Sequence, residues 1–163
     1  MAKCVPKPEV SERENKGIGG RRGGKSAKSS GTYFENQTAS YFNNEVSTAK
    51  RIIGSGAFGK ILRDPNLLGD VKINFPVLRQ DILADCKFGY SRGTKQLSIH
   101  QEWFEKIGLE AELTGRYPSV IVKFKGTRGP NSRVICFTWQ TFTDMMKELT
   151  ELVQNLEEPY KED

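Results

Sequence analysis

Residues 70–88 alternate apolar and polar side chains, and this alternation constrains the fold more than any other feature of the chain. A first strand covers residues 71–75, where valine, isoleucine and phenylalanine alternate with lysine and asparagine. Residues 76–79, Pro-Val-Leu-Arg, offer a turn, and residues 82–88 are typical of a second strand. The segment therefore predicts a β-hairpin.

The position of the turn fixes which residues of the two strands face each other. A turn centred between residues 77 and 78 places Val71 opposite Ala84 and Ile73 opposite Ile82. These four side chains then share one apolar face, since successive side chains of a strand point to opposite sides.

The same register gathers charged groups at one end of the hairpin. Asp70 lies opposite Asp85 on the polar face, and Lys87 projects to the same side. Mg²⁺ prefers oxygen ligands and commonly takes one or two protein carboxylates. A lysine beside it can orient a water and offset charge on a phosphate transition state. The alternative is a solvated strand face with an ordinary cross-strand ion pair.

Composition excludes several classes of protein. The chain has 163 residues, 36% of them hydrophobic and 28% charged, which is typical of a soluble domain with a core. No apolar run approaches the roughly 18 residues of a membrane span, and the N-terminus has no signal-peptide pattern. The three cysteines lack metal-binding spacing and indicate reduced thiols. We expect a cytoplasmic protein with no membrane partner.

The excess positive charge lies in residues 1–30, which hold eight Lys and Arg against three Glu. This stretch is rich in Gly and Ser and predicts a flexible basic arm, ahead of a domain over 31–157 and a short tail over 158–163. A basic arm favours nucleic acid as the partner, the alternative being a solubilising tail. Its candidate DNA-binding residues are Arg21, Arg22, Lys25 and Lys28.

The rest of the chain predicts three helices and two more strands. We expect helices at about 32–44 (with continuation to Lys50 as an alternative), 97–113 and 141–156, and strands at 120–125 and 134–139. The second helix is expected to bury Leu97, Trp103, Phe104, Ile107 and Leu113. The apolar stripe of the third consists of Phe142, Met145, Met146, Leu149 and Leu152. This order predicts an α/β fold with a central mixed β-sheet flanked by helices.

Residues 54–60, Gly-Ser-Gly-Ala-Phe-Gly-Lys, match two phosphate-binding patterns. Ile61 stands where a nucleotide-binding loop needs Ser or Thr, and Arg-Asp-Pro-Asn at 63–66 prevents a following helix. We therefore expect no nucleotide cofactor. The loop is better interpreted as lying against a nucleic-acid phosphate, with Ser55 and Lys60 as donors.

The segment after the hairpin adds polar candidates. Arg92 and Lys95 lie in a loop beside the predicted site and are candidate DNA-binding residues. His100 is the single histidine, so a zinc site or a Ser-His-Asp triad is not favoured. Gln101 could reach toward the site, and its role stays open.

A helix carrying a glutamate, a Gly-Ser-Gly loop, an aspartate and an acid-x-Lys hairpin, in this order, resemble the PD-(D/E)xK nuclease superfamily. Within it, the chain is most similar to the archaeal-type Holliday junction resolvases, which also occur in phages. The resemblance runs from about Gly31 to Trp139. It implies a restriction-endonuclease-like fold, hydrolysis with Mg²⁺ or Mn²⁺, and a homodimer that makes paired nicks in four-way DNA junctions.

The resemblance also assigns roles. Asp70 and Asp85 correspond to metal ligands, and Lys87 to the catalytic lysine. Glu35, at the end of Gly-Thr-Tyr-Phe-Glu, would be the third acidic ligand, directly or through water. Glu45 competes for that role because it lies nearer to the glycine loop.

Two further assignments and two departures complete the comparison with the family. Ser55 resembles the loop serine near the scissile phosphate, and the carbonyl of Cys86 is a plausible extra metal ligand. Asp85 stands where Glu is more usual, and Gly69, not Pro, precedes Asp70. We expect a structure-selective DNA endonuclease. The alternatives are another nuclease of this superfamily, of restriction, mismatch or nicking type, or a DNA-binding protein without catalysis.

Overall fold

The computed structural model describes residues 20–45, 47–54, 64–88, 91–92, 96–124 and 130–157. The elements in chain order are α1 (Gly20–Glu45), β1 (Thr48–Arg51), η1 (Pro65–Leu67), β2 (Val71–Asn74), β3 (Ile82–Phe88), β4 (Ser91–Arg92), β5 (Gln96–Leu97), α3 (Gln101–Glu112), β6 (Tyr117–Lys123), η2 (Pro130–Ser132), β7 (Arg133–Cys136) and α4 (Trp139–Glu157).

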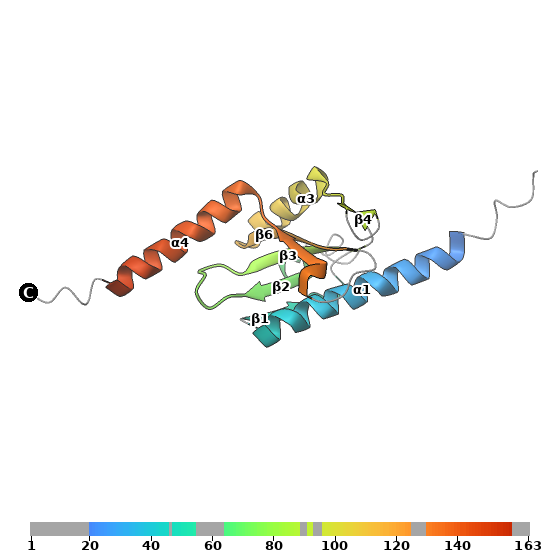
Figure 1. The fold of residues 1–163 in the computed structure, drawn as a ribbon, viewed down its shortest axis with the longest axis horizontal. Coiled ribbons are helices and arrows are strands. Elements are labelled where there is room, and N and C mark those ends of the chain that lie inside the picture. Colours follow the sequence, from blue (N-terminus) through green and yellow to red (C-terminus); the bar gives the residue numbers. More distant parts are fainter. Residues whose placement is uncertain are drawn as a thin grey trace, which may run out of the picture.

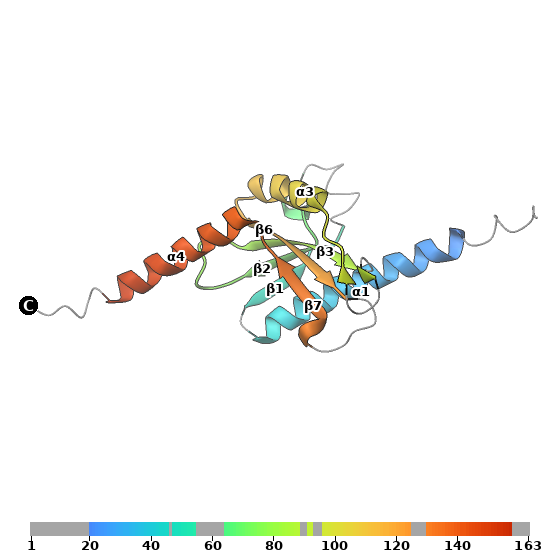
Figure 2. The same ribbon diagram turned by 45° about the horizontal axis from the view of Figure 1, so that its top comes forward.

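The described strands form a five-stranded mixed sheet in the order β1-β2-β3-β6-β7, and β4 pairs separately with β5. β3 and β6 run parallel, while the other neighbours in the large sheet are antiparallel. A parallel pair requires a crossover, and α3 supplies it. Helices α1 and α3 cover opposite faces of the sheet (Figures 1 and 2). The predicted α/β class, with a mixed sheet and flanking helices, is confirmed.

The predicted hairpin register is confirmed in β2 and β3. Val71 pairs with Ala84, and Ile73 pairs with Ile82. All four side chains are buried, and they pack against Phe34 of α1. Burying each large apolar side chain contributes roughly 1.5–3 kcal/mol, so a slip by one residue would lose most of this core.

The other face of the sheet packs on α3. Trp103 and Ile107 contact Leu83 of β3 and Val120 of β6 in a second buried cluster. Side chains alternate along β3, so Leu83, Asp85 and Lys87 all point toward this α3 face. The polar end of the hairpin is therefore held between the sheet and α3.

Several predicted boundaries differ from the structure. Helix α1 begins at Gly20, so its first eleven residues fall inside the predicted flexible arm. Lys and Arg favour helices, and extending an existing helix adds a hydrogen bond for each residue fixed. Helix α3 begins at Gln101, because residues 96–97 form β5, and Leu113 lies 73% exposed just beyond the helix end.

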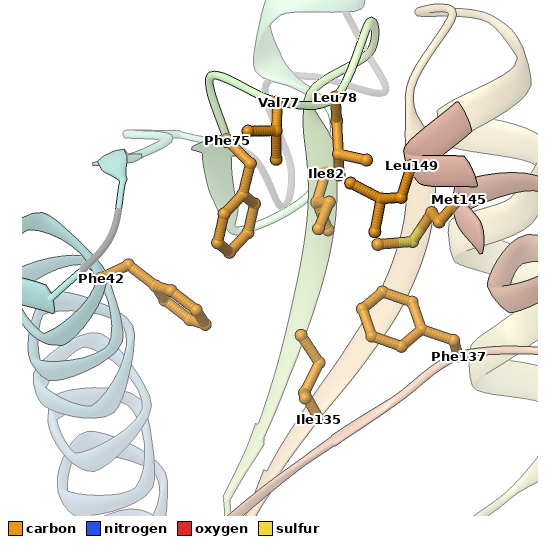
Figure 3. A pocket seen from close by; sticks show the side chains of 9 residues that line it. All are labelled: Phe42, Phe75, Val77, Leu78, Ile82, Ile135, Phe137, Met145 and Leu149. Atoms are coloured by element: carbon orange, nitrogen blue, oxygen red, sulfur yellow. The ribbon is translucent and has the colours of Figure 1, made fainter. Parts of the chain in front are cut away.

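The apolar stripe of helix α4 is only partly covered by the rest of the chain. It projects from the body of the protein (Figures 1 and 2). Met145 and Leu149 line an apolar pocket of about 270 Å³ that also includes Phe42 of α1 (Figure 3). Phe142 and Met146 are instead 46% and 38% exposed, because the helix lies largely clear of the sheet. No described helix is long and apolar enough to span a bilayer.

Candidate active site

Asp85 is the centre of the polar cluster between the sheet and α3. Asp85 is 1% exposed. The Nζ of Lys87 lies 2.7 Å from Oδ2, and the Nζ of Lys106 donates to Oδ1 at 2.9 Å. Lys87 also lies over the ring of Trp103, 5.6 Å from its centroid. One buried carboxylate thus holds two ammonium groups, one from its own strand and one from α3.

The hydrogen bonds of Asp85 are incomplete on the side of Lys87. Its Oδ2 is buried and, despite the short ion pair, accepts no well-directed hydrogen bond from a described residue. A buried carboxylate oxygen in this state has lone-pair capacity left for a further cation or water.

Asp70 is fixed at the same end of the hairpin by backbone hydrogen bonds. Its N–H donates to the carbonyl of Ala84 at 2.9 Å, and its carbonyl accepts from Ile52 N–H at 2.8 Å. Its Oδ2 accepts from the N–H of Cys86 at 2.8 Å. The carboxylate is therefore held against β3, beside the strand position of Asp85.

The pKa of Asp70 is raised from 3.8 to about 6. Burial is the main cause, and the charges of Asp85 and Glu35 add to it, while the Cys86 N–H and Lys106 oppose it. Three carboxylates therefore act on one another at this site. A cation bound there would lower the pKa of Asp70 again.

The backbone conformation of Gly69 lets the chain place Asp70 close against β3. Its φ is +72°, and a Cβ would lie 2.6 Å from Cδ1 of the buried Leu83. Its N–H also donates to Oε2 of Glu110 on α3, at 2.9 Å. Only glycine adopts this conformation without strain and at this distance from the strand.

Glu35 lies on α1 and is engaged by a neighbouring cation. Its Oε2 accepts a hydrogen bond from Nε of Arg51 at 2.6 Å. Its charge raises the pKa of Asp70 and that of the Cys86 thiol, so it is electrostatically part of the site. The side chain of Glu45 lies outside the described residues, and its helix position alone does not decide between the two glutamates.

The described donor set offers two carboxylates to a divalent metal. Within the described residues, no three His, Cys, Asp or Glu side chains are arranged to hold a metal ion together. Glu35 is turned to Arg51, and the thiol of Cys86 packs on the apolar side, where burial raises its pKa well above the usual value. Asp70 and Asp85 remain, and two carboxylates with water fit the coordination habit of Mg²⁺. The Cys86 carbonyl stays a prediction.

Most of the other predicted site residues have no described side chain. Ser55, Lys60 and Lys95 lie outside the described residues, and only the backbone is described for Arg21, Arg22, Lys25, Lys28 and Arg92. Gln101 donates to Glu105 on the exposed start of α3. Lys106 was missed by the sequence analysis, because its contact with Asp85 joins a helix to a strand and has no local pattern.

No protein-family model matches the chain, and no curated protein sequence matches it. Among solved structures, it is similar to a Holliday junction resolvase of the archaeal hyperthermophile Archaeoglobus fulgidus. The two are 13% identical, the match covers 70% of this chain and 88% of that chain, and the TM-score is 0.42. A similarity of this size establishes neither a shared fold nor a shared function.

Proposed function

We propose that this protein is a metal-dependent DNA endonuclease of the PD-(D/E)xK type, with a restriction-endonuclease-like fold and four-way junctions as its preferred substrate. The observation that carries the proposal is the end of the β2–β3 hairpin. There Asp70 and Asp85 share one site, and Lys87 lies 2.7 Å from Asp85. Two acids and a lysine in this arrangement suit hydrolysis of a phosphodiester.

The chain's own residues supply distinct functions. Asp70 and Asp85 would hold Mg²⁺, which supplies a Lewis acid and a more acidic bound water. Lys87 is restrained between Asp85 and the Trp103 ring, and its ammonium group would orient the attacking water. Lys106 pairs with the other oxygen of Asp85 and holds that carboxylate in place from α3. Glu35, which pairs with Arg51 here, would complete the metal shell directly or through water.

Homodimer formation is part of the proposal, since a four-way junction presents two equivalent strands to a two-fold dimer. The exposed apolar face of α4 supports a second copy of this chain as the partner. Trp139, Val153 and Leu156 are 83%, 53% and 64% exposed. A tryptophan such as Trp139 offers roughly 150–250 Å², so this face would supply part of the roughly 800 Å² that each partner of a stable pair buries.

Cleavage of synthetic junctions tests the function. Wild type with Mg²⁺ should nick a four-way junction in opposed strands, and chelation by EDTA should stop the reaction. Asp70→Asn and Lys87→Met should each reduce the rate about 100-fold or more, with junction binding in EDTA within several-fold of wild type. Asp81→Asn is the matched control, because it removes a carboxylate that pairs with Lys72 in the same hairpin.

Each outcome separates the candidates. Equal cleavage of junction and plain duplex would replace the resolvase by another nuclease of this type. Tight binding with no cleavage under any divalent metal would favour a DNA-binding protein without catalysis. Unchanged activity of Lys87→Met would remove Lys87 from the reaction.

A further inference from the structure

A second pair of cations lies on the α1 face of the sheet, away from Asp85. Lys123 of β6 and Arg133 of β7 are directly paired across the two antiparallel strands. Lys123 Nζ donates to Oε1 of Gln37 at 3.3 Å, and Arg133 Nη2 donates to the same oxygen at 3.1 Å. Like charges directly opposite each other destabilise a sheet, so this arrangement costs stability in the free protein.

Nothing in the described part of the chain neutralises this pair. Neither cation makes an ion pair with a described carboxylate, and the buried Nε of Arg133 donates to no described group. The pKa of Lys123 is lowered, first by burial and then by Arg133. A single neutral oxygen therefore receives hydrogen bonds from two charged donors.

Aromatic rings hold both cations in place. The guanidinium of Arg133 lies 5.9 Å from the ring centroid of Tyr41, and Lys123 Nζ lies 5.9 Å from that of Phe88. The pair is thus positioned before any ligand arrives. A phosphate group, with several acceptor oxygens and a negative charge, is the kind of ligand that completes such a set of donors.

The pair is close to the candidate active site in the sheet but on the other face. Lys123 pairs with Phe88 in the parallel β3–β6 register, and Phe88 directly follows Lys87. Alternation sends Lys87 toward α3 and Lys123 toward α1. A phosphate on this pair would therefore be a different one from that attacked beside Lys87.

We propose that Lys123 and Arg133, positioned by Gln37, bind a phosphate of the DNA backbone that is not cleaved. This inference rests on the proposed nuclease function, and it adds contacts on the opposite face of the sheet from Asp85.

Junction binding in EDTA, followed by fluorescence anisotropy over a range of salt concentrations, tests the proposal. Lys123→Gln/Arg133→Gln should weaken binding and reduce the slope of log K against log salt by about 1, since one neutralised phosphate contributes roughly 0.9. Arg79→Gln/Lys147→Gln removes the same charge from exposed residues on the hairpin turn and α4, and should leave the slope unchanged. The melting temperature of the first variant should equal or exceed that of wild type.

If wild type binds and cleaves junctions but the salt slope of Lys123→Gln/Arg133→Gln is unchanged, the phosphate site is overturned and the nuclease function stands. A lower melting temperature with an unchanged slope would mean that the pair is structural. Junction binding that depends on the pair, without any cleavage, would support the site and contradict the nuclease. If millimolar inorganic phosphate raises the wild-type melting temperature through these residues while no DNA binds, the site takes a small anion and both proposals fail.

Discussion

A pair of cations lies on each face of the sheet, and the two pairs are in opposite electrostatic states. On the α3 face, Lys87 and Lys106 share the buried carboxylate of Asp85. On the α1 face, Lys123 and Arg133 share only the amide oxygen of Gln37. The first pair has a carboxylate between its cations, and Glu110 lies 3.7 Å from Lys106 as well, whereas the second pair has no described carboxylate within ion-pair distance and is left for a ligand to neutralise. Two cations on a sheet can thus support the fold when a carboxylate lies between them, or remain available to bind an anion when only a neutral oxygen does.

The difference also separates stability from binding. A buried carboxylate that has lost its cations, or cations that have lost their carboxylate, cost the folded state several kcal/mol. Like charges held together without a counterion cost less when they reach the solvent. Removing a cation from the Asp85 cluster should therefore lower the free energy of unfolding, whereas removing Lys123 or Arg133 should not.

The largest effect is expected from Asp85→Ala. This variant leaves Lys87 without its carboxylate, while Lys106 keeps only the longer pair with Glu110 at 3.7 Å. Because both ammonium groups are partly exposed, the free energy of unfolding should fall by about 3 kcal/mol, the low end for a broken buried pair. Urea unfolding at pH 7 measures the change. Adding Lys106→Met should recover part of the loss, and full additivity of the two substitutions would contradict the coupling.

Asp70→Asn is expected to act in the opposite direction. The pKa of Asp70 is about 6 in the folded protein and 3.8 as its ordinary value, so wild type loses stability as the pH rises between these values. The variant should be more stable by about 1–3 kcal/mol at pH 8 and equal to wild type below pH 4. Denaturant unfolding at both pH values checks this.

Mg²⁺ extends the same comparison. If Asp70 helps to hold the ion, Mg²⁺ at pH 8 should raise the melting temperature of wild type and have less effect on Asp70→Asn. Equal shifts in the two proteins would place the metal elsewhere.

Lys106→Met sharpens the comparison at a smaller scale. Its charged hydrogen bond to Asp85 is partly exposed, and its loss should cost about 1 kcal/mol. The methionine keeps the apolar stem, so urea unfolding reports mainly the lost charge. A stabilised variant would show that Lys87 alone satisfies Asp85.

Lys123→Met should give the smallest change, a gain of a few tenths of a kcal/mol, because it relieves the repulsion from Arg133. The two lysine-to-methionine variants thus differ in sign. A loss of 1 kcal/mol in Lys123→Met would mean that its bond to Gln37 outweighs the repulsion, and the contrast between the faces would fail.

The hairpin could be predicted because its information is local. Alternation at period two and one turn fix the register of Val71 with Ala84, and the same periodicity places Lys87 beside Asp85. Lys106 could not be predicted, since its partner lies 21 residues away and the two meet only when α3 packs on the sheet. Lys123 and Arg133 were missed for the same reason, because Gln37 joins them from α1.

The ends of the chain show the limits of composition and periodicity. Gly and Ser suggested a flexible arm, yet α1 begins at Gly20. The apolar stripe of α4 was predicted correctly as a pattern, but its period does not say what covers it. Phe142 and Met146 of that stripe are exposed in this chain, whereas Met145 and Leu149 line the apolar pocket.

The left-handed backbone at Gly69 has a consequence for how this sequence can evolve. Proline, for example, fixes φ near −65° and lacks the N–H that Glu110 receives, so it does not fit this position. A Cβ here would also meet the side chain of Leu83. Position 69 can therefore leave glycine only if Leu83 and Glu110 change with it, which makes three positions far apart in the sequence mutationally dependent on one another.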